Sequence, residues 1–274
     1  MLWAKGRFDE AEPLLCEALE IGRETLGNHH PAVAIRLNNL GNLFRATGSY
    51  GKAEPLLCEA LEFLRAAFGD RHPDVANCLS NLAGLLAATG RVEQAEPIFR
   101  EALEVSRLSL GDRHPDVASR LNNLAGLLEV TGRTVEAEIL YREALALGRA
   151  TLGDCHPTVA TRLNNLAGLL HDTGFVDQAE PHFREALQIS REALGDRHPD
   201  VGQSLNNLAG LLEATGRAGE ATPLFLEALD IVRTSLGDAH PHTRKVAENT
   251  LIHLREHAPD HPDLPGLAEA FPDL

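Results

Sequence analysis

Residues 112–153 read DRHPDVASRLNNLAGLLEVTGRTVEAEILYREALALGRATLG, and variants of this 42-residue stretch fill most of the chain. Its last residue belongs to a series of glycines spaced 42 residues apart, and a proline follows each of them four positions later. A second glycine series with the same period divides every unit into two segments of helical length. A fixed period of this size is the sequence signature of a repeat architecture. The glycines that end the units are Gly27, Gly69, Gly111, Gly153, Gly195 and Gly237.

Both segments of this unit have the apolar spacing of an amphipathic helix. In the first, Leu121, Leu124 and Leu128 lie three or four residues apart, as one face of a helix requires. Pro115 fits the first helical position, where its missing N–H has no helical partner, and Gly132 ends the helix. We name the first helix of each unit helix A and the second helix B.

A single helix pair cannot bury its apolar face, whereas stacked pairs cover one another. The sequence therefore predicts an all-α fold, a right-handed solenoid of stacked antiparallel helix pairs over residues 1–257. We expect a leading B helix at 8–26, five A–B pairs over 31–236 and a closing helix at 241–257. Aromatic residues make up only 4% of the chain, so we expect Leu, Ala and Val to fill the core.

The last residues, 258–274, contain four prolines and are expected to form a loosely ordered tail. Their apolar residues offer two other arrangements. The tail could dock on the last repeat as a cap, or it could occupy the binding groove. The residues concerned are Leu264, Leu267, Phe271 and Leu274.

Charge and composition exclude some classes of partner. The net charge of -15 repels nucleic-acid phosphates and anionic lipid, so we expect neither partner. No apolar run approaches the roughly 18 residues of a membrane span. The four cysteines form no C-x-x-C pair and fit reduced thiols, so we predict a cytoplasmic protein.

The repeat resembles a known family. Leucine, alanine and glycine recur at the spacing L-x-x-L-A-x-x-L-x-x-x-G over residues 79–90, followed by A-x-x-x-F-x-x-A over 95–102. This pattern is similar to the tetratricopeptide repeat, whose usual unit is about 34 residues. The longer unit here, with its GDRHPDVA entry at 69–76, resembles the repeats of kinesin light chains. HEAT and armadillo repeats have a comparable period, but they do not explain this spacing.

The resemblance implies capture of a peptide or partner protein in a groove that the A helices line. Leu79 and Leu86 stand where the common repeat often has Trp and Tyr. The chain also lacks the heptad coiled coil that precedes the repeats of kinesin light chains, so a role in kinesin transport does not transfer. Opposite the leucine stripe of the A helices, we expect these groove residues: Asn38, Arg45, Asn77, Ser80, Asn122, Glu129, Asn164, His171, Asn206 and Glu213.

The chemistry of these groove residues suggests the kind of ligand that they bind. Asn side chains donate and accept, so they can pair with the backbone of an extended peptide. Cations are scarce among the groove residues, so we expect a neutral or basic, partly apolar peptide. The mid-helix glycines have two interpretations, room for a ligand or tight contact between A helices. These glycines are Gly84, Gly126, Gly168 and Gly210.

A second asparagine in each A helix, for example Asn81 or Asn249, is expected to bond between repeats. Six histidines precede the repeat prolines and are expected to cap the A helices rather than bind metal. No nucleotide-binding loop, nucleophile elbow or H-E-x-x-H helix is present. We therefore expect no catalytic site, no metal and no cofactor.

The predicted function is a protein–protein interaction module, an adaptor or scaffold. The alternatives are a sensor array of a larger signalling protein, which would act through curvature change or self-association, and a passive spacer. The sequence begins with residues that look like the end of an A helix. The leading B helix would then expose Leu14, Leu15 and Leu19. Two explanations follow: the chain is a fragment of a longer repeat array, or this open N-terminal edge stacks on another molecule, which includes self-association.

Overall fold

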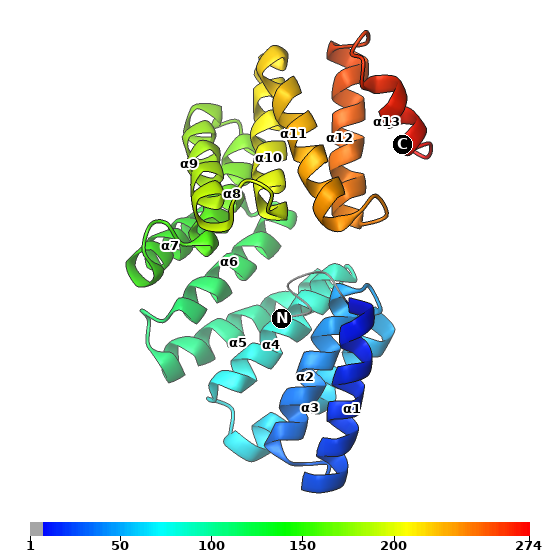
Figure 1. The fold of residues 1–274 in the computed structure, drawn as a ribbon. Coiled ribbons are helices and arrows are strands. Elements are labelled where there is room, and N and C mark those ends of the chain that lie inside the picture. The colour runs from blue at the N-terminus through cyan, green and yellow to red at the C-terminus, as the bar shows by residue number, and fades with distance from the viewer. Residues whose placement is uncertain (1–7) are drawn as a thin grey trace. The chain divides into compact units, whose positions relative to one another are not determined.

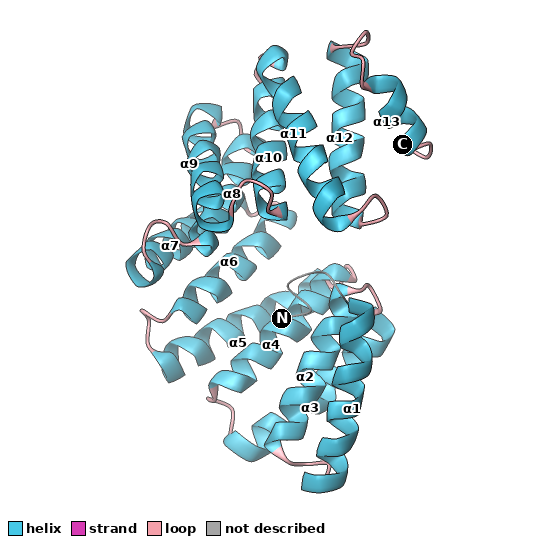
Figure 2. Ribbon diagram, viewed as in Figure 1, coloured by secondary structure: helices cyan, strands magenta, loops and turns pink. Residues whose placement is uncertain are grey.

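The computed structural model describes residues 8–274, and this part of the chain is helical throughout, without a strand (Figures 1 and 2). Leu2 to Gly6, interpreted above as the end of an A helix, lie outside the described residues. The helices are α1 (Phe8–Leu26), α2 (Pro31–Ala46), α3 (Tyr50–Phe68), α4 (Pro73–Ala88), α5 (Val92–Leu110), α6 (Pro115–Val130), α7 (Thr134–Leu152), α8 (Pro157–Asp172), α9 (Val176–Leu194), α10 (Pro199–Ala214), α11 (Ala218–Leu236), α12 (Pro241–His257) and α13 (Leu264–Ala270).

The chain forms two compact units, which we describe separately. Unit 1 runs to Leu147 and contains α1 to α6 with most of α7, and unit 2 runs from Gly148 to Leu274. The all-α class and the stacked helix pairs are as predicted, and the helices begin and end where the two glycine series and the prolines placed them. A single continuous solenoid over residues 1–257 stays a prediction.

The histidine before each repeat proline caps helix A. In α4 the imidazole Nδ1 of His72 accepts a hydrogen bond from the backbone N–H of Asp74 at 3.2 Å, and His72 itself is extended, as a residue before proline prefers to be. The cap prediction is therefore confirmed. The same bond recurs at His30, His114, His156, His198 and His240.

The glycine that ends helix A adopts a left-handed conformation. Gly90 has φ of 77°, its N–H donates to the carbonyl of Ala87, and the N–H of Arg91 reaches the carbonyl of Leu86 at 2.8 Å. These bonds satisfy carbonyls that the helix leaves open, and a residue with a Cβ would be strained there. The glycine therefore fixes the turn into helix B.

The cores of both units consist of leucine and alanine from facing helices. Within unit 1, Ala53 and Ala95 are fully buried on the B helices and let the paired A helices approach closely, while Leu79 and Leu121 fill the space between. Unit 2 repeats the arrangement, with Leu163 and Leu205 buried in the same way.

Arginine–glutamate pairs join successive B helices along their exposed side. In unit 1 Arg23 contacts Glu59 at 2.9 Å, and in unit 2 Arg191 contacts Glu227 at 2.6 Å. Members of each pair are 36 residues apart, so a residue of one repeat meets the next repeat. The remaining pairs of this series are Arg65–Glu101, Arg107–Glu143 and Arg149–Glu185.

The expectation of a loosely ordered tail is wrong, because residues after α12 fold back as α13. Leu267 is 8% exposed and Phe271 2% exposed, and both pack into the core of α10, α11 and α12. The guanidinium of Arg233 lies over the Phe271 ring at 5.4 Å. The docked cap, one of the alternatives above, is the observed arrangement, since its apolar spacing outweighs the proline content of the segment.

Acid should destabilise the fold through two equivalent carboxylates. Glu96 in unit 1 bonds Arg133 and Arg100, and Glu180 in unit 2 bonds Arg184 and Arg217. These hydrogen bonds hold the pKa of both carboxyls below the ordinary value of 4.5.

A group with a lowered folded pKa stabilises the fold above its unfolded pKa and loses that contribution as the pH falls through the folded pKa. We therefore expect the melting temperature to fall below about pH 4.5. The variant Glu96→Gln/Glu180→Gln should lose about 0.5–1 kcal/mol per site at pH 7 and show a smaller fall in acid. Thermal unfolding followed by circular dichroism from pH 7 to pH 3 measures this, and parallel curves for the two proteins would contradict it.

Candidate functional site

The A helices of unit 2 line a hollow of about 360 Å³, which we call the unit 2 hollow. Its walls come from α8, α10 and α12, with aromatic rings from the B helices α9 and α11. Three of its residues, His171, Asn206 and Glu213, were predicted from the sequence. The remaining side chains include Asp172, Asn207, Asn249, Phe183, Phe225 and Ile252.

Two glycines leave this hollow open. A Cβ added at Gly168 or Gly210 would meet no other atom within 4 Å. Each glycine costs about 1 kcal/mol of helix propensity relative to alanine, and no helix contact there requires it. In unit 1 the matching glycines have neighbours, because a Cβ at Gly84 would lie 3.7 Å from Arg45 and one at Gly126 would lie 3.3 Å from the Tyr141 hydroxyl. Tight helix contact therefore does not account for the two glycines of unit 2.

Asparagine side chains connect successive A helices. The amide of Asn249 donates to the side-chain oxygen of Asn206 at 3.0 Å, and Asn81 donates to Asn38 at the same distance. At these two positions the expected bonding of the second asparagine between repeats is observed. Its partner is the first asparagine of the preceding repeat, so Asn38 and Asn206 also hold repeats together, and Asn206 is only 9% exposed.

The other polar groove residues of unit 1 are also engaged or partly covered. Asn77 accepts a hydrogen bond from the guanidinium of Arg120, and Ser80 is 5% exposed, so it does not lie on the surface. Arg45 donates to Asn42 at 2.9 and 3.0 Å, and burial lowers its pKa. Asn122 is half-buried on α6.

Glu129 of α6 accepts a hydrogen bond from the hydroxyl of Tyr141 at 2.7 Å. Burial, together with this carboxylate, raises the pKa of Tyr141, which therefore stays protonated. In unit 2 His171 lies 3.4 Å from the carboxylate of its neighbour Asp172. Glu129 and His171 are 42 residues apart, so the carboxylate and the imidazole occupy equivalent positions of successive A helices.

A smaller hollow of about 180 Å³ adjoins the first and shares Asn207 with it. Asn164 lines the smaller hollow, and its amide donates to the hydroxyl of Ser204 at 2.9 Å. Its side-chain oxygen is buried and accepts no hydrogen bond from the described residues. Other polar residues of this hollow are Thr161, Asn165 and Gln203.

Glu213 has two histidine neighbours that the sequence analysis missed. His253 Nδ1 lies 2.6 Å from Glu213 Oε1, and His257 Nε2 lies 3.5 Å from the same oxygen. Both histidines belong to α12, one helical turn apart. The segment H-L-R-E-H at 253–257 was the available signal, since it places two imidazoles on one helix face.

The leading helix α1 exposes apolar side chains, with Leu14 56% and Ile21 51% exposed. Leu19 was expected on this open edge and is instead buried, since only 5% of it is exposed. Self-association through this edge stays a prediction.

The cysteines are free thiols. Cys78 is fully buried, and burial raises its pKa to about 12, so the thiol is protonated at neutral pH and is not a nucleophile. Among the helices of residues 8–274, none is long and apolar enough to cross a membrane.

The family model of the tetratricopeptide repeat matches residues 1–66, 59–105, 74–150 and 158–234. The chain belongs to the tetratricopeptide repeat family. Its fold is similar to that of a putative kinesin light chain with nearly identical TPR-like repeats. Members are generally non-enzymatic modules for protein–protein interaction. No curated protein has a sequence that matches this chain.

Several solved structures are similar. BtubC (BKLC) from P. vanneervenii is 27% identical, with 87% of this chain and 94% of that chain covered and a TM-score of 0.67. A putative kinesin light chain from Podosopora anserina, with nearly identical TPR-like repeats, is 23% identical over 76% and 98% of the chains (TM-score 0.61). The Rap protein complexed with competence and sporulation factor is 15% identical over 98% and 73% (TM-score 0.66).

Two glycines of α10 should respond oppositely to alanine. A Cβ at Gly210 meets nothing, so Gly210→Ala should stabilise the chain by about 1 kcal/mol through helix propensity. A Cβ at Gly202 would lie 2.8 Å from Val232 and 3.2 Å from the carbonyl oxygen of Ala228, so Gly202→Ala should destabilise by about 1–3 kcal/mol. Urea unfolding of the two variants measures both changes. Destabilisation by Gly210→Ala would show that the space there is filled, and stabilisation by Gly202→Ala would show that α11 yields to the added Cβ.

Proposed function

We propose that this tetratricopeptide repeat protein is a non-catalytic adaptor that binds an extended segment of a partner protein along its A helices, chiefly in the unit 2 hollow. The observation that carries this proposal is the open space over Gly168 and Gly210. A protein that gains nothing from that space would be more stable with alanine at both positions. Retaining glycine there is understandable if a ligand backbone approaches closely.

The lining of the hollow suggests how the segment is held. Asn207 and Asn249 supply amide groups, which can pair with a peptide backbone whatever its sequence. Ile252 is 46% exposed and supplies apolar surface for a side chain of the ligand, while Phe183 and Phe225 are buried beneath the hollow at 3% and 2% exposed. The combination of a few polar groups with apolar surface is typical of ligand sites.

The charge of the hollow favours a neutral or basic segment. The Asp172 side chain is 70% exposed, and Glu213 lies on the same face, while no lysine or arginine is among the lining residues. An acidic ligand would meet only repulsion here, and the net charge of -15 adds to it at longer range. For the same reason we expect neither a nucleic acid nor an anionic membrane as partner. We propose a cytoplasmic location.

The similar structures are compatible with this role. The Rap protein was solved with competence and sporulation factor bound, so one protein with this fold holds a ligand. At 15% identity the likeness extends to the fold alone, and the choice of ligand for the present chain rests on its own hollow.

The test fills the hollow without disturbing the fold. Gly168→Leu/Gly210→Leu places two side chains in open space, whereas Gly219→Leu adds the same bulk at an exposed position of α11 where a Cβ also meets nothing. Peptides would be selected from a random displayed library on immobilised wild-type protein, and their dissociation constants measured against all three proteins.

The selected peptides should be neutral or basic and partly apolar. They should bind the double variant at least tenfold more weakly, a loss of about 1.4 kcal/mol, and the Gly219→Leu control as tightly as wild type. Equal binding to all three proteins would place the site elsewhere. Helix content and melting temperature of each variant establish that the fold is retained.

A further inference from the structure

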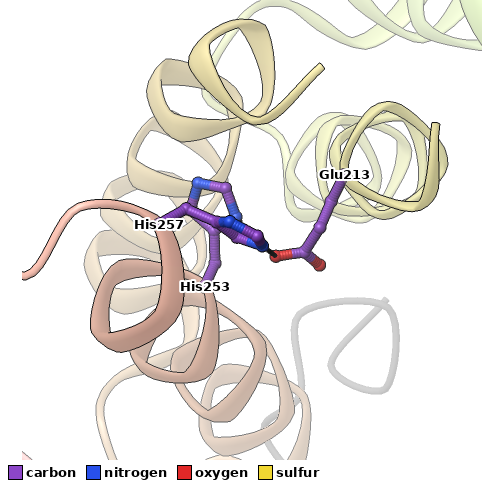
Figure 3. Close-up of side chains that lie close together, drawn as sticks. All are labelled: Glu213, His253 and His257. Carbon is purple, nitrogen blue, oxygen red and sulfur yellow. Dashed lines mark hydrogen bonds and ion pairs between the residues drawn. The ribbon is translucent and has the colours of Figure 1, made fainter. Parts of the chain in front are cut away.

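One acidic and two imidazole side chains converge between α10 and α12 (Figure 3). Glu213 comes from the last turn of α10, and His253 and His257 come from successive turns of α12. Their nearest nitrogen and oxygen atoms all lie within 4.8 Å of one another. His253 is completely buried, whereas the side chains of Glu213 and His257 are 28% and 38% exposed.

These residues depart from the repeat. The position of His253 is a leucine in each of the five preceding A helices, and that of His257 is a threonine that follows each of them. The position of Thr222, which contacts His253, is a glutamate in all five preceding B helices. The corresponding residues are Leu43, Leu85, Leu127, Leu169 and Leu211; Thr47, Thr89, Thr131, Thr173 and Thr215; and Glu12, Glu54, Glu96, Glu138 and Glu180.

Three substitutions of repeat residues therefore meet at one point of unit 2. Packing alone does not account for the histidine, because a buried leucine serves the same position in every other repeat. Burying an imidazole costs free energy unless both ring nitrogens have partners.

Hydrogen bonding orients the buried ring. The Thr222 hydroxyl donates to the carbonyl of Ala218 at 3.0 Å and lies 2.8 Å from His253 Nε2, where its oxygen can accept a hydrogen bond from Nε2–H. In the tautomer with the proton on Nε2, the lone pair of Nδ1 points at the Glu213 carboxylate 2.6 Å away. A lone pair and a carboxylate repel each other unless a cation lies between them.

We propose that Glu213 Oε1, His253 Nδ1 and His257 Nε2 bind a divalent transition metal, with Zn²⁺ the best match. Two imidazoles and one carboxylate are ligands that zinc takes, and three protein ligands leave a fourth position for water or a ligand group. Thr222 then holds the His253 ring from behind, the usual arrangement for a metal-bound histidine.

The distances need only a small adjustment. With bonds of about 2.0–2.1 Å, two ligands of a tetrahedral zinc ion are roughly 3.3 Å apart. The separation of 3.5 Å between His257 and Glu213 already fits this geometry. The separation of 2.6 Å between His253 and Glu213 has to widen, and Glu213 is exposed enough to move. Glu256, 3.9 Å from His257 Nε2, adds negative charge that favours a cation.

The bound ion would cross-link α10 to α12 and would neutralise Glu213, which lines the unit 2 hollow. This site stands on the three ligands and does not depend on peptide binding. Its test therefore uses metal alone, and the outcome is independent of the peptide-binding experiment.

The experiment uses the full chain without a histidine tag, stripped of metal with a chelator and titrated with Zn²⁺ against a chromophoric chelator. His253→Leu/His257→Thr installs the residues that the other repeats carry, so this variant is built to fold. Two control variants alter matching positions of other repeats: Glu129→Gln removes the carboxylate that corresponds to Glu213 in unit 1, and His171→Ala removes an imidazole of the unit 2 hollow.

Wild type should bind one Zn²⁺, and saturating metal should raise its melting temperature. The double variant should bind at least 100-fold more weakly and show no such rise, while both controls behave as wild type. Glu213→Gln provides a second measurement if the double variant fails to fold, because the side-chain amide can still hydrogen-bond His253 Nδ1 with either tautomer of the ring. Binding of Zn²⁺ by the double variant or by Glu213→Gln with the affinity of wild type would overturn the proposal.

Discussion

The structure depends on the fact that no helix pair of this chain can bury its apolar face alone. Each pair is stabilised by the next, through leucines such as Leu121 and Leu163 that are fully buried in their units. The strict 42-residue period is a consequence, because one inserted residue would rotate an apolar stripe away from its neighbour. The Arg–Glu pairs repeat with the same period, and asparagine side chains meet at two equivalent positions, so both reinforce contacts that burial has already selected.

Periodic features were predictable from the sequence, because each of them recurs in several repeats. The His–Pro helix start, the glycine ends and the buried leucines recur in every unit, so chance variation at one copy does not obscure them. The function of the first asparagine was harder to predict, because its partner is a side chain 43 residues away and depends on how far one A helix lies from the next. The order of residues 258–274 was missed because Pro and Asp favour a loop locally, whereas burial of Leu267 and Phe271 decides the outcome.

Two features of unit 2 are not explained by packing alone. Gly168 and Gly210 leave space at a cost in helix propensity, and His253 replaces a leucine in a buried position. The space over the glycines is found by asking what a Cβ would touch, and the setting of His253 by following the hydrogen bonds of a buried ring. The recurring glycines were noted in the sequence with two interpretations left open, whereas the histidines were missed, although comparison of each repeat with the other copies points directly to them.

The short helix α13 also has a consequence for assembly. A stack of similar helix pairs presents the same kind of face at each step, so the outer face of its last helix is complementary to the first helix of another stack. Such a head-to-tail contact does not close on itself and would allow filaments to grow. By covering α12 with Leu267 and Phe271, α13 occupies the face on which another copy would add. The seven residues of α13 would therefore oppose head-to-tail addition of another copy at this end of unit 2.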